Sequence, residues 1–187
     1  MTGLDPRNNG PPCVGRRLQT GDNCNLRALA DAVVAAVWQV DERMLVPVGG
    51  PDGNLAFEPR TLLAMLTICY ARQIYGSAEV AARLRRDLDF CRVCQDKIPD
   101  ATTLRRFRSE NRPALNFCLK ATLRFLAEEK IAQGLLASMS EDHLAEEASR
   151  RIITAMFTDS IELDRSQASD GTVELCILVA KGGAAVH

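Results

Sequence analysis

Two groups of side chains have types and spacings that could bind a metal ion. Cys91 and Cys94 form a CxxC pair, the spacing at which two thiolates bind zinc. Structural zinc takes four ligands, and neither a second CxxC pair nor a histidine lies nearby, so we interpret these cysteines as buried thiols. Asp159, Glu162 and Asp164 could bind Mg²⁺, although acidic runs at a helix end are usually solvated.

A third group consists of arginines on two short predicted helices, residues 77–90 and 101–111. In a helix-turn-helix, the second helix presents its N-terminal residues to base edges while arginines bind phosphates. This interpretation predicts that eight residues contact DNA. The two threonines would contact base edges, and the arginines would contact phosphates. The eight residues are Arg83, Arg85, Arg86, Thr102, Thr103, Arg105, Arg106 and Arg108. An ordinary solvated helix face has the same composition and remains the alternative.

The motifs of common catalytic sites are missing from the sequence. We find no glycine-rich phosphate loop, no nucleophile elbow and no catalytic pair that includes histidine. We therefore expect neither enzymatic activity of the chain alone nor a cofactor.

Charge is distributed unevenly along the 187 residues. The net charge is only −1, which gives no overall attraction to nucleic acid or membrane. Residues 58–112 contain 11 basic and 7 acidic side chains, whereas residues 127–170 contain 4 and 10. A basic middle segment followed by an acidic one favours a polyanion contact in the middle of the chain.

The N-terminal sequence has no apolar signal segment, and no stretch of the chain reaches transmembrane length. Seven cysteines without a secretory signal indicate reduced thiols in a cytoplasmic protein, with no membrane partner.

The elements that would position these side chains are helices. Apolar residues at three- and four-residue steps predict helices after a cap at Asn23 or Asn25, from Pro59, after an N-cap at Ser77, after an N-cap at Asp100, from Pro113 and after Ser140. Only residues 172–180 have the composition of a strand. The prediction is an all-α compact helical bundle with a helix-turn-helix-like pair.

The predicted elements divide the chain into four parts. Residues 1–23 form a flexible leader rich in glycine and proline, and residues 24–134 form the helical domain. Residues 135–168 form an acidic helix, and residues 169–187 form a strand-like or disordered tail.

A set of ordered positions resembles the N-terminal helical domain of bacterial insertion-sequence transposases of the DDE, RNase H-like class. The resemblance covers about residues 25–120. The matching positions are Pro59, Arg60, Leu62, Leu63, Leu66, Tyr70, Ser77, Asp87, Phe90, Pro99, Asp100, Thr103, Phe107 and Arg108. Cys91, Val93 and Cys94 depart from the family, which usually has an aromatic residue and a glycine there.

The resemblance implies a DNA-binding module of transposase origin, a truncated or domesticated transposase. The family's catalytic domain holds two magnesium ions with three spaced acids. Asp170 lies in an Asp-Gly-Thr like that of the first acid, but polar residues precede it and the other two positions have no counterpart here. We therefore expect no strand-transfer activity. The alternative is a helical interaction or dimerisation module that assembles with a full-length transposase or another partner, including a second copy.

Overall fold

The computed structural model describes residues 26–49, 57–86 and 98–182, with side chains described from residue 27 to 166 within these ranges. Six α-helices lie in this described part: α1 (Leu26–Trp38), α2 (Pro59–Ala71), α3 (Ser77–Leu84), α5 (Ala101–Glu110), α6 (Arg112–Ala132) and α7 (Glu141–Gly182). A short 3-10 helix, η1 (Glu42–Met44), follows α1. The all-α prediction is confirmed for these residues. The predicted leader and the Cys91–Cys94 pair lie outside them.

Local sequence explains where several helices begin. Asp100 is the N-cap of α5, as predicted, and its side chain accepts a 2.6 Å hydrogen bond from the Thr103 amide. Pro59 is the first residue of α2, where its missing N–H costs nothing. The hydroxyl of Ser140, just before α7, accepts from the His143 amide at 3.2 Å. Ser77, predicted as the N-cap of its helix, is instead the first residue of α3 after Gly76.

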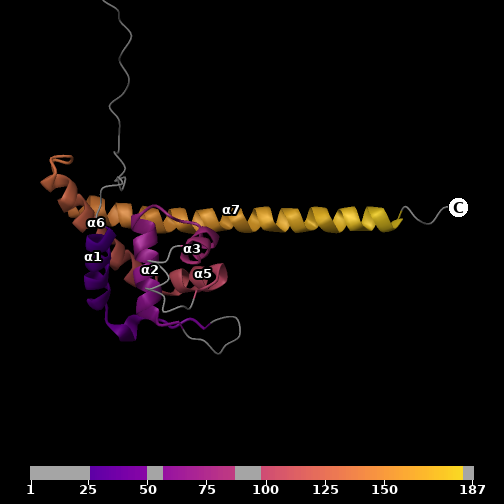
Figure 1. The fold of residues 1–187 in the computed structure, drawn as a ribbon, viewed down its shortest axis with the longest axis horizontal. Helices are drawn as coiled ribbons and strands as arrows, with labels where there is room; N and C mark the ends of the chain where they lie inside the picture. The colour runs from indigo at the N-terminus through magenta and orange to yellow at the C-terminus, as the bar shows by residue number, and fades with distance from the viewer. Residues whose placement is uncertain (1–25, 50–56, 87–97, 183–187) are drawn as a thin grey trace, which may run out of the picture.

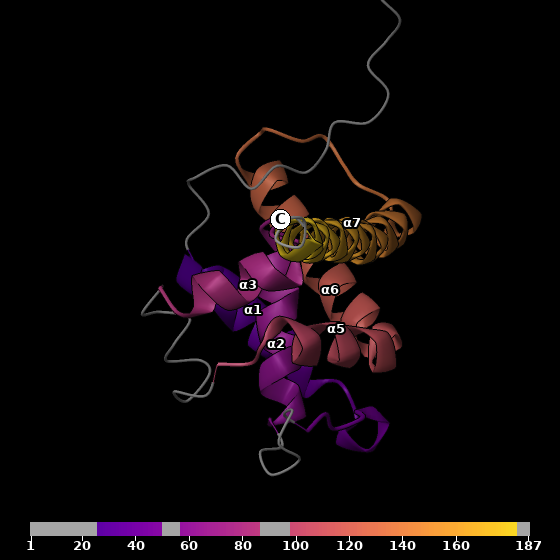
Figure 2. The ribbon, with the colours of Figure 1, turned by 90° about the vertical axis from the view of Figure 1, so that its right-hand side faces the viewer.

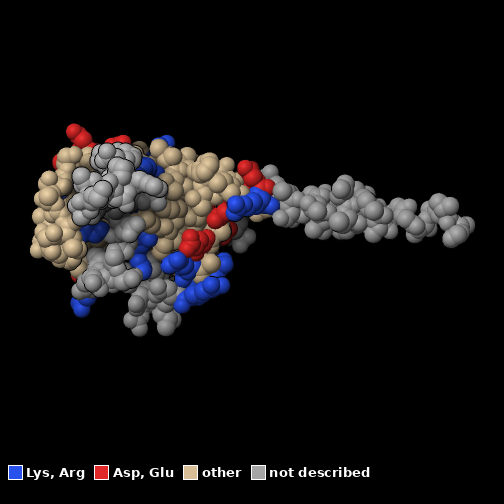
Figure 3. Space-filling model, turned by 90° about the horizontal axis from the view of Figure 1, so that it is seen from above, with Lys and Arg blue, Asp and Glu red and all other residues tan. Residues whose placement is uncertain are grey.

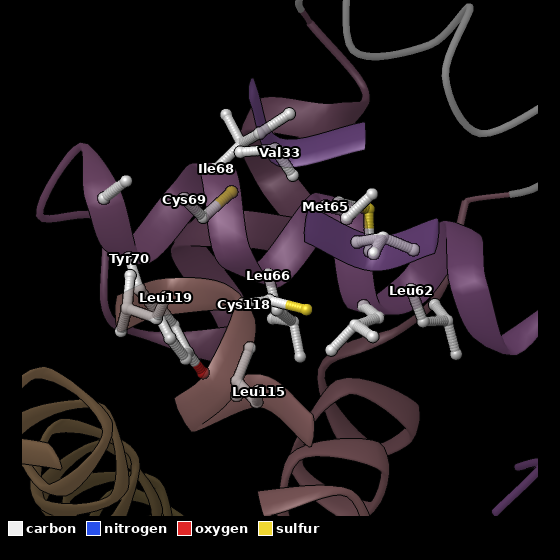
Figure 4. Close-up of a cluster of buried hydrophobic side chains, with 14 of the residues drawn as sticks. Val33, Leu62, Met65, Leu66, Ile68, Cys69, Tyr70, Leu115, Cys118 and Leu119 are labelled. Carbon is white, nitrogen blue, oxygen red and sulfur yellow. The ribbon is translucent and has the colours of Figure 1, made fainter. Parts of the chain in front are cut away.

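Helix α2 forms the centre of the hydrophobic core. Every residue from Leu62 to Ala71 is buried, and α1 and α6 pack against this helix. Figure 4 shows side chains of α2 and α6 in one cluster, among them Leu66, Leu115 and Cys118. A helix that is buried all round can only sit between other helices, which explains why the flanking helices show one-sided patterns and α2 does not.

Helix α7 lies across the body and then extends beyond it (Figure 1). Figure 2 looks along this helix and shows α1, α2, α3 and α5 below it, while the last part of α6 rises past it. Leu144, Ala148, Ile152 and Ala155 are buried on its inner side. Among the described residues, no helix is both long enough and apolar enough to cross a membrane.

The strand-like character expected for residues 172–180 is not found in the structure. The backbone of α7 remains helical through Gly182. The physical reason is hydrogen bonding: an isolated strand has no neighbour for its backbone groups, whereas a helix pairs them within the segment.

Candidate nucleic-acid interface

Helices α3 and α5, which carry the predicted DNA-contacting residues, pack against each other. Asp100 fixes the start of α5, and hydrogen bonds from Thr103 hold the pKa of this carboxyl below its usual value. The carboxylate therefore stays ionised at the N-terminus of α5, where a negative charge is favourable. Much of the connection between α3 and α5 lies outside the described residues.

Five predicted contact residues have side chains at the surface. Arg83, Arg85, Arg86, Thr102 and Arg106 are exposed, and Arg105 is partly exposed. These side chains could reach a ligand without repacking of the core.

Two of the exposed arginines already have acidic partners on their own helix. Arg83 pairs with Glu79 and Arg106 with Glu110, each at 2.9 Å and four residues apart. Exposed pairs of this kind contribute only about 0.3–0.5 kcal/mol, so a phosphate could displace the carboxylate at little cost. The partly exposed Arg105 makes a long hydrogen bond of 3.3 Å to the Thr102 hydroxyl. These contacts leave the arginines available for phosphate binding.

Basic side chains gather near the point where α7 leaves the body (Figure 3). Acidic side chains lie among them in the same view. Arg85 and Arg86, just past the end of α3, form no ion pair among the described residues. Their charge is therefore not neutralised by an ion pair within this part of the chain.

Thr103 and Arg108 do not fit the predicted role. Thr103 is 4% exposed and Arg108 is 5% exposed, so neither side chain can meet DNA without rearrangement of the core. Four-residue spacing from Leu104 places Arg108 on the inward side of α5 together with Phe107. We therefore remove both residues from the candidate interface and assign them structural roles.

Arg108 belongs to a buried polar cluster that joins four helices. Its Nη2 donates to Asp159 Oδ2 of α7 at 2.6 Å, and its Nη1 donates to the Tyr70 hydroxyl of α2 at 3.0 Å. Nη1 also lies 3.4 Å from the Ser77 hydroxyl of α3. Asp159 in turn accepts from the Ser77 amide at 2.7 Å and from its hydroxyl at 2.6 Å. We call Tyr70, Ser77, Arg108 and Asp159 the buried cluster.

Burial and the neighbouring charges have opposite effects on the pKa values in this cluster. Burial raises the pKa of Tyr70 to about 12, although the Arg108 guanidinium acts in the other direction. Burial alone would lower the pKa of Arg108, but Tyr70 and Asp159 outweigh it and the pKa is raised. Arg108 is therefore a permanent buried cation that depends on its partners.

A second buried arginine ties α7 to the end of α2. Arg151 Nη1 donates to the carbonyl oxygens of Tyr70 at 2.9 Å and Ala71 at 2.7 Å, and its Nε donates to Glu147 at 2.7 Å. The last carbonyls of a helix lack intrahelical partners, so this guanidinium satisfies two of them. It also places a positive charge at the negative end of α2.

One member of the acidic group considered for Mg²⁺ has other partners in the structure. Asp159 is engaged by Arg108 and Ser77, and Asp164 is exposed. Within the described part of the chain, no cluster of three or more potential ligands is positioned to hold a metal ion.

The fold and surface define a small helical domain with arginines exposed on a packed helix pair. The transposase domain family DUF772 matches residues 17–110, half of the chain. The chain belongs to this family. Neither the curated proteins nor the solved structures that were compared contained a match.

The raised pKa of Tyr70 predicts a loss of stability at alkaline pH. Because the folded-state pKa lies above the ordinary 10, this contribution is complete below pH 10 and is lost as the pH rises from 10 to about 12. We expect the urea unfolding midpoint of the wild type to fall more between pH 9 and pH 11.5 than that of Tyr70→Phe. Equal falls in the wild type and in Tyr70→Phe would contradict the prediction.

Proposed function

We propose that this chain is the DNA-binding module of a transposase-derived protein and has no strand-transfer activity of its own. The observation that carries the proposal is the set of arginines exposed on α3, on α5 and just past α3, within the transposase-family match. Arg83, Arg85, Arg86, Arg105 and Arg106 would bind phosphates, and Thr102 at the start of α5 would reach a base edge.

The packing supports this assignment. On both helices apolar side chains such as Val80, Leu84, Leu104 and Phe107 are buried, while the arginines kept in the candidate interface lie at least partly at the surface. Burial on one side leaves the basic side free to contact a duplex. Residues 127–170 contain 10 acidic and only 4 basic side chains, so the low net charge of the whole chain does not argue against a local basic surface on α3 and α5.

A salt-dependent binding assay tests the proposal. Each phosphate contact lowers log affinity by ~0.9 per log unit of salt, so Arg85→Ala/Arg86→Ala and Arg105→Ala/Arg106→Ala should each reduce the slope by nearly 2. We expect each double variant to bind terminal-repeat DNA at least ten-fold more weakly in 100 mM salt.

The control removes the same charge elsewhere. Arg27→Ala/Arg43→Ala changes exposed arginines on α1 and η1, away from α3 and α5, and should retain wild-type affinity and slope. No binding by the wild type in 50 mM salt, or equal weakening by all three double variants, would refute the proposal.

Self-association through α7 is a second candidate function. Ile153 and Phe157 lie one turn apart on this helix and are 53% and 66% exposed, and Met156 is 42% exposed beside them. Leu144 and Ile152 are buried and are not available to a partner. Sedimentation velocity over a hundred-fold concentration range should show a dimer that Ile153→Asp/Phe157→Asp abolishes. A monomer at every concentration would exclude this candidate.

A further inference from the structure

Helix α7 contacts the α2–α3 corner at two points. Arg151 binds the last carbonyls of α2, and Asp159 binds the first amide of α3. Eight residues separate these side chains, which is about 12 Å along a helix. The corner between them, residues 72–76, is therefore held at both of its ends by one rigid element.

Asp159 also connects α3 to α5. Its Oδ1 accepts from the Ser77 amide, while its Oδ2 accepts both from the Ser77 hydroxyl and from Arg108. One carboxylate thus contacts both helices that carry the candidate interface. Hydrogen bonds have preferred directions, so this carboxylate restricts the relative orientation of the two helices more tightly than apolar packing would.

Helix α3 needs this contact more than a longer helix would. It has only eight residues, and its N-cap Gly76 offers no side-chain hydrogen bond. Short helices are marginal without outside support, and an unmade cap leaves amides unsatisfied. Asp159, 82 residues further along the chain, provides the missing cap.

We propose that Asp159 is a positioning residue for DNA recognition: it sets the orientation of α3 relative to α5 and thereby aligns the arginines on the two helices. This inference rests on the proposed function. It goes beyond it by assigning a DNA-binding role to a residue on α7 that touches no DNA and lies outside the family match.

The decisive variant separates stability from orientation. Arg108→Met/Asp159→Leu replaces the buried pair with apolar side chains, a change that often leaves stability equal or higher. We expect it to unfold at a temperature within a few degrees of the wild type. Its affinity for terminal-repeat DNA should nevertheless fall at least ten-fold, because the directional contacts are gone. If this double variant had both wild-type stability and wild-type affinity for DNA, the inference would be overturned.

Amide hydrogen exchange without DNA gives an independent measurement. Exchange in α3 should accelerate at least ten-fold in this variant, while exchange in α1 and α6 stays at the wild-type rate. Asp164→Asn, at an exposed acid of the same helix, is the control and should change neither exchange nor affinity. If the amides of α3 exchanged at the wild-type rate in the double variant, that result would count against a positioning role for Asp159.

A second variant decides the matter if the double variant does not fold. Asp159→Asn keeps the shape of the side chain and loses its charge, and it should also accelerate exchange in α3 selectively; unchanged exchange there would overturn the inference. Failure of the wild type to bind DNA would refute the proposed function, and it would also refute the role in recognition. In that case selective exchange would show only that Asp159 orders α3.

Discussion

Replacing Asp159 with alanine is expected to lower the free energy of unfolding by about 3–5 kcal/mol, because it leaves Arg108 as an unpaired buried cation. The loss includes the two hydrogen bonds to Ser77 at the start of α3. Urea unfolding followed by circular dichroism measures it. Asp164→Ala removes an exposed carboxylate from the same helix and should change stability by less than about 0.5 kcal/mol.

A small effect would show that the buried cluster is not coupled as the distances indicate. If Asp159→Ala and Asp164→Ala had the same stability, water or another side chain would have to solvate Arg108 in the folded protein. The double variant Arg108→Met/Asp159→Leu should be more stable than Asp159→Ala, because it removes the unpaired buried charge together with its partner.

A chain that ends at residue 133 is expected to lose cooperative folding, although it contains the whole family match. It lacks α7 and therefore Leu144 and Ile152. Burial of each of these side chains contributes about 1.5–3 kcal/mol to the free energy of unfolding. It also leaves Arg108 without its partner carboxylate, which lowers the free energy of unfolding by about 3–5 kcal/mol. Together these losses approach the ~5–15 kcal/mol that a typical domain has in total.

The matched control keeps the inner half of α7. A chain that ends at residue 166 retains Arg151, Asp159 and the apolar residues of α7 that are buried among the described side chains, so we expect it to melt within a few degrees of the full chain. Calorimetry distinguishes the two. A sharp transition in the 133-residue chain, at a temperature near that of the full chain, would show that α7 is not part of the folding unit.

Local signals in the sequence predicted most helix starts. Asp100 before α5, Pro59 at the start of α2 and Ser140 before α7 act over a few residues, and the structure places them as expected. The composition of residues 172–180 is typical of a strand, but the segment is helical, because composition alone does not supply a neighbouring strand.

The buried cluster could not be predicted from charge alone. Arg108 looked like its exposed neighbours Arg105 and Arg106, and Asp159 looked like part of a solvated acidic face. The spacing held a usable signal: Arg108 follows Leu104 by four residues, and Asp159 follows Ala155 by four, so each lies on a buried stripe. Nothing local connects the two residues, however, because 51 positions separate them. Only the packing of α7 against α6, α2 and α3 brings them together.

The place of Asp159 in the chain constrains how this domain can be exchanged between proteins. Arg108 lies inside the segment that the family shares, while its partner carboxylate lies 49 positions after residue 110, where that match ends. A recombination event that joined residues 17–110 to an unrelated downstream sequence would inherit the cation without its counterion. Viable chimeras should therefore either carry α7 along or arrive with a compensating change at position 108.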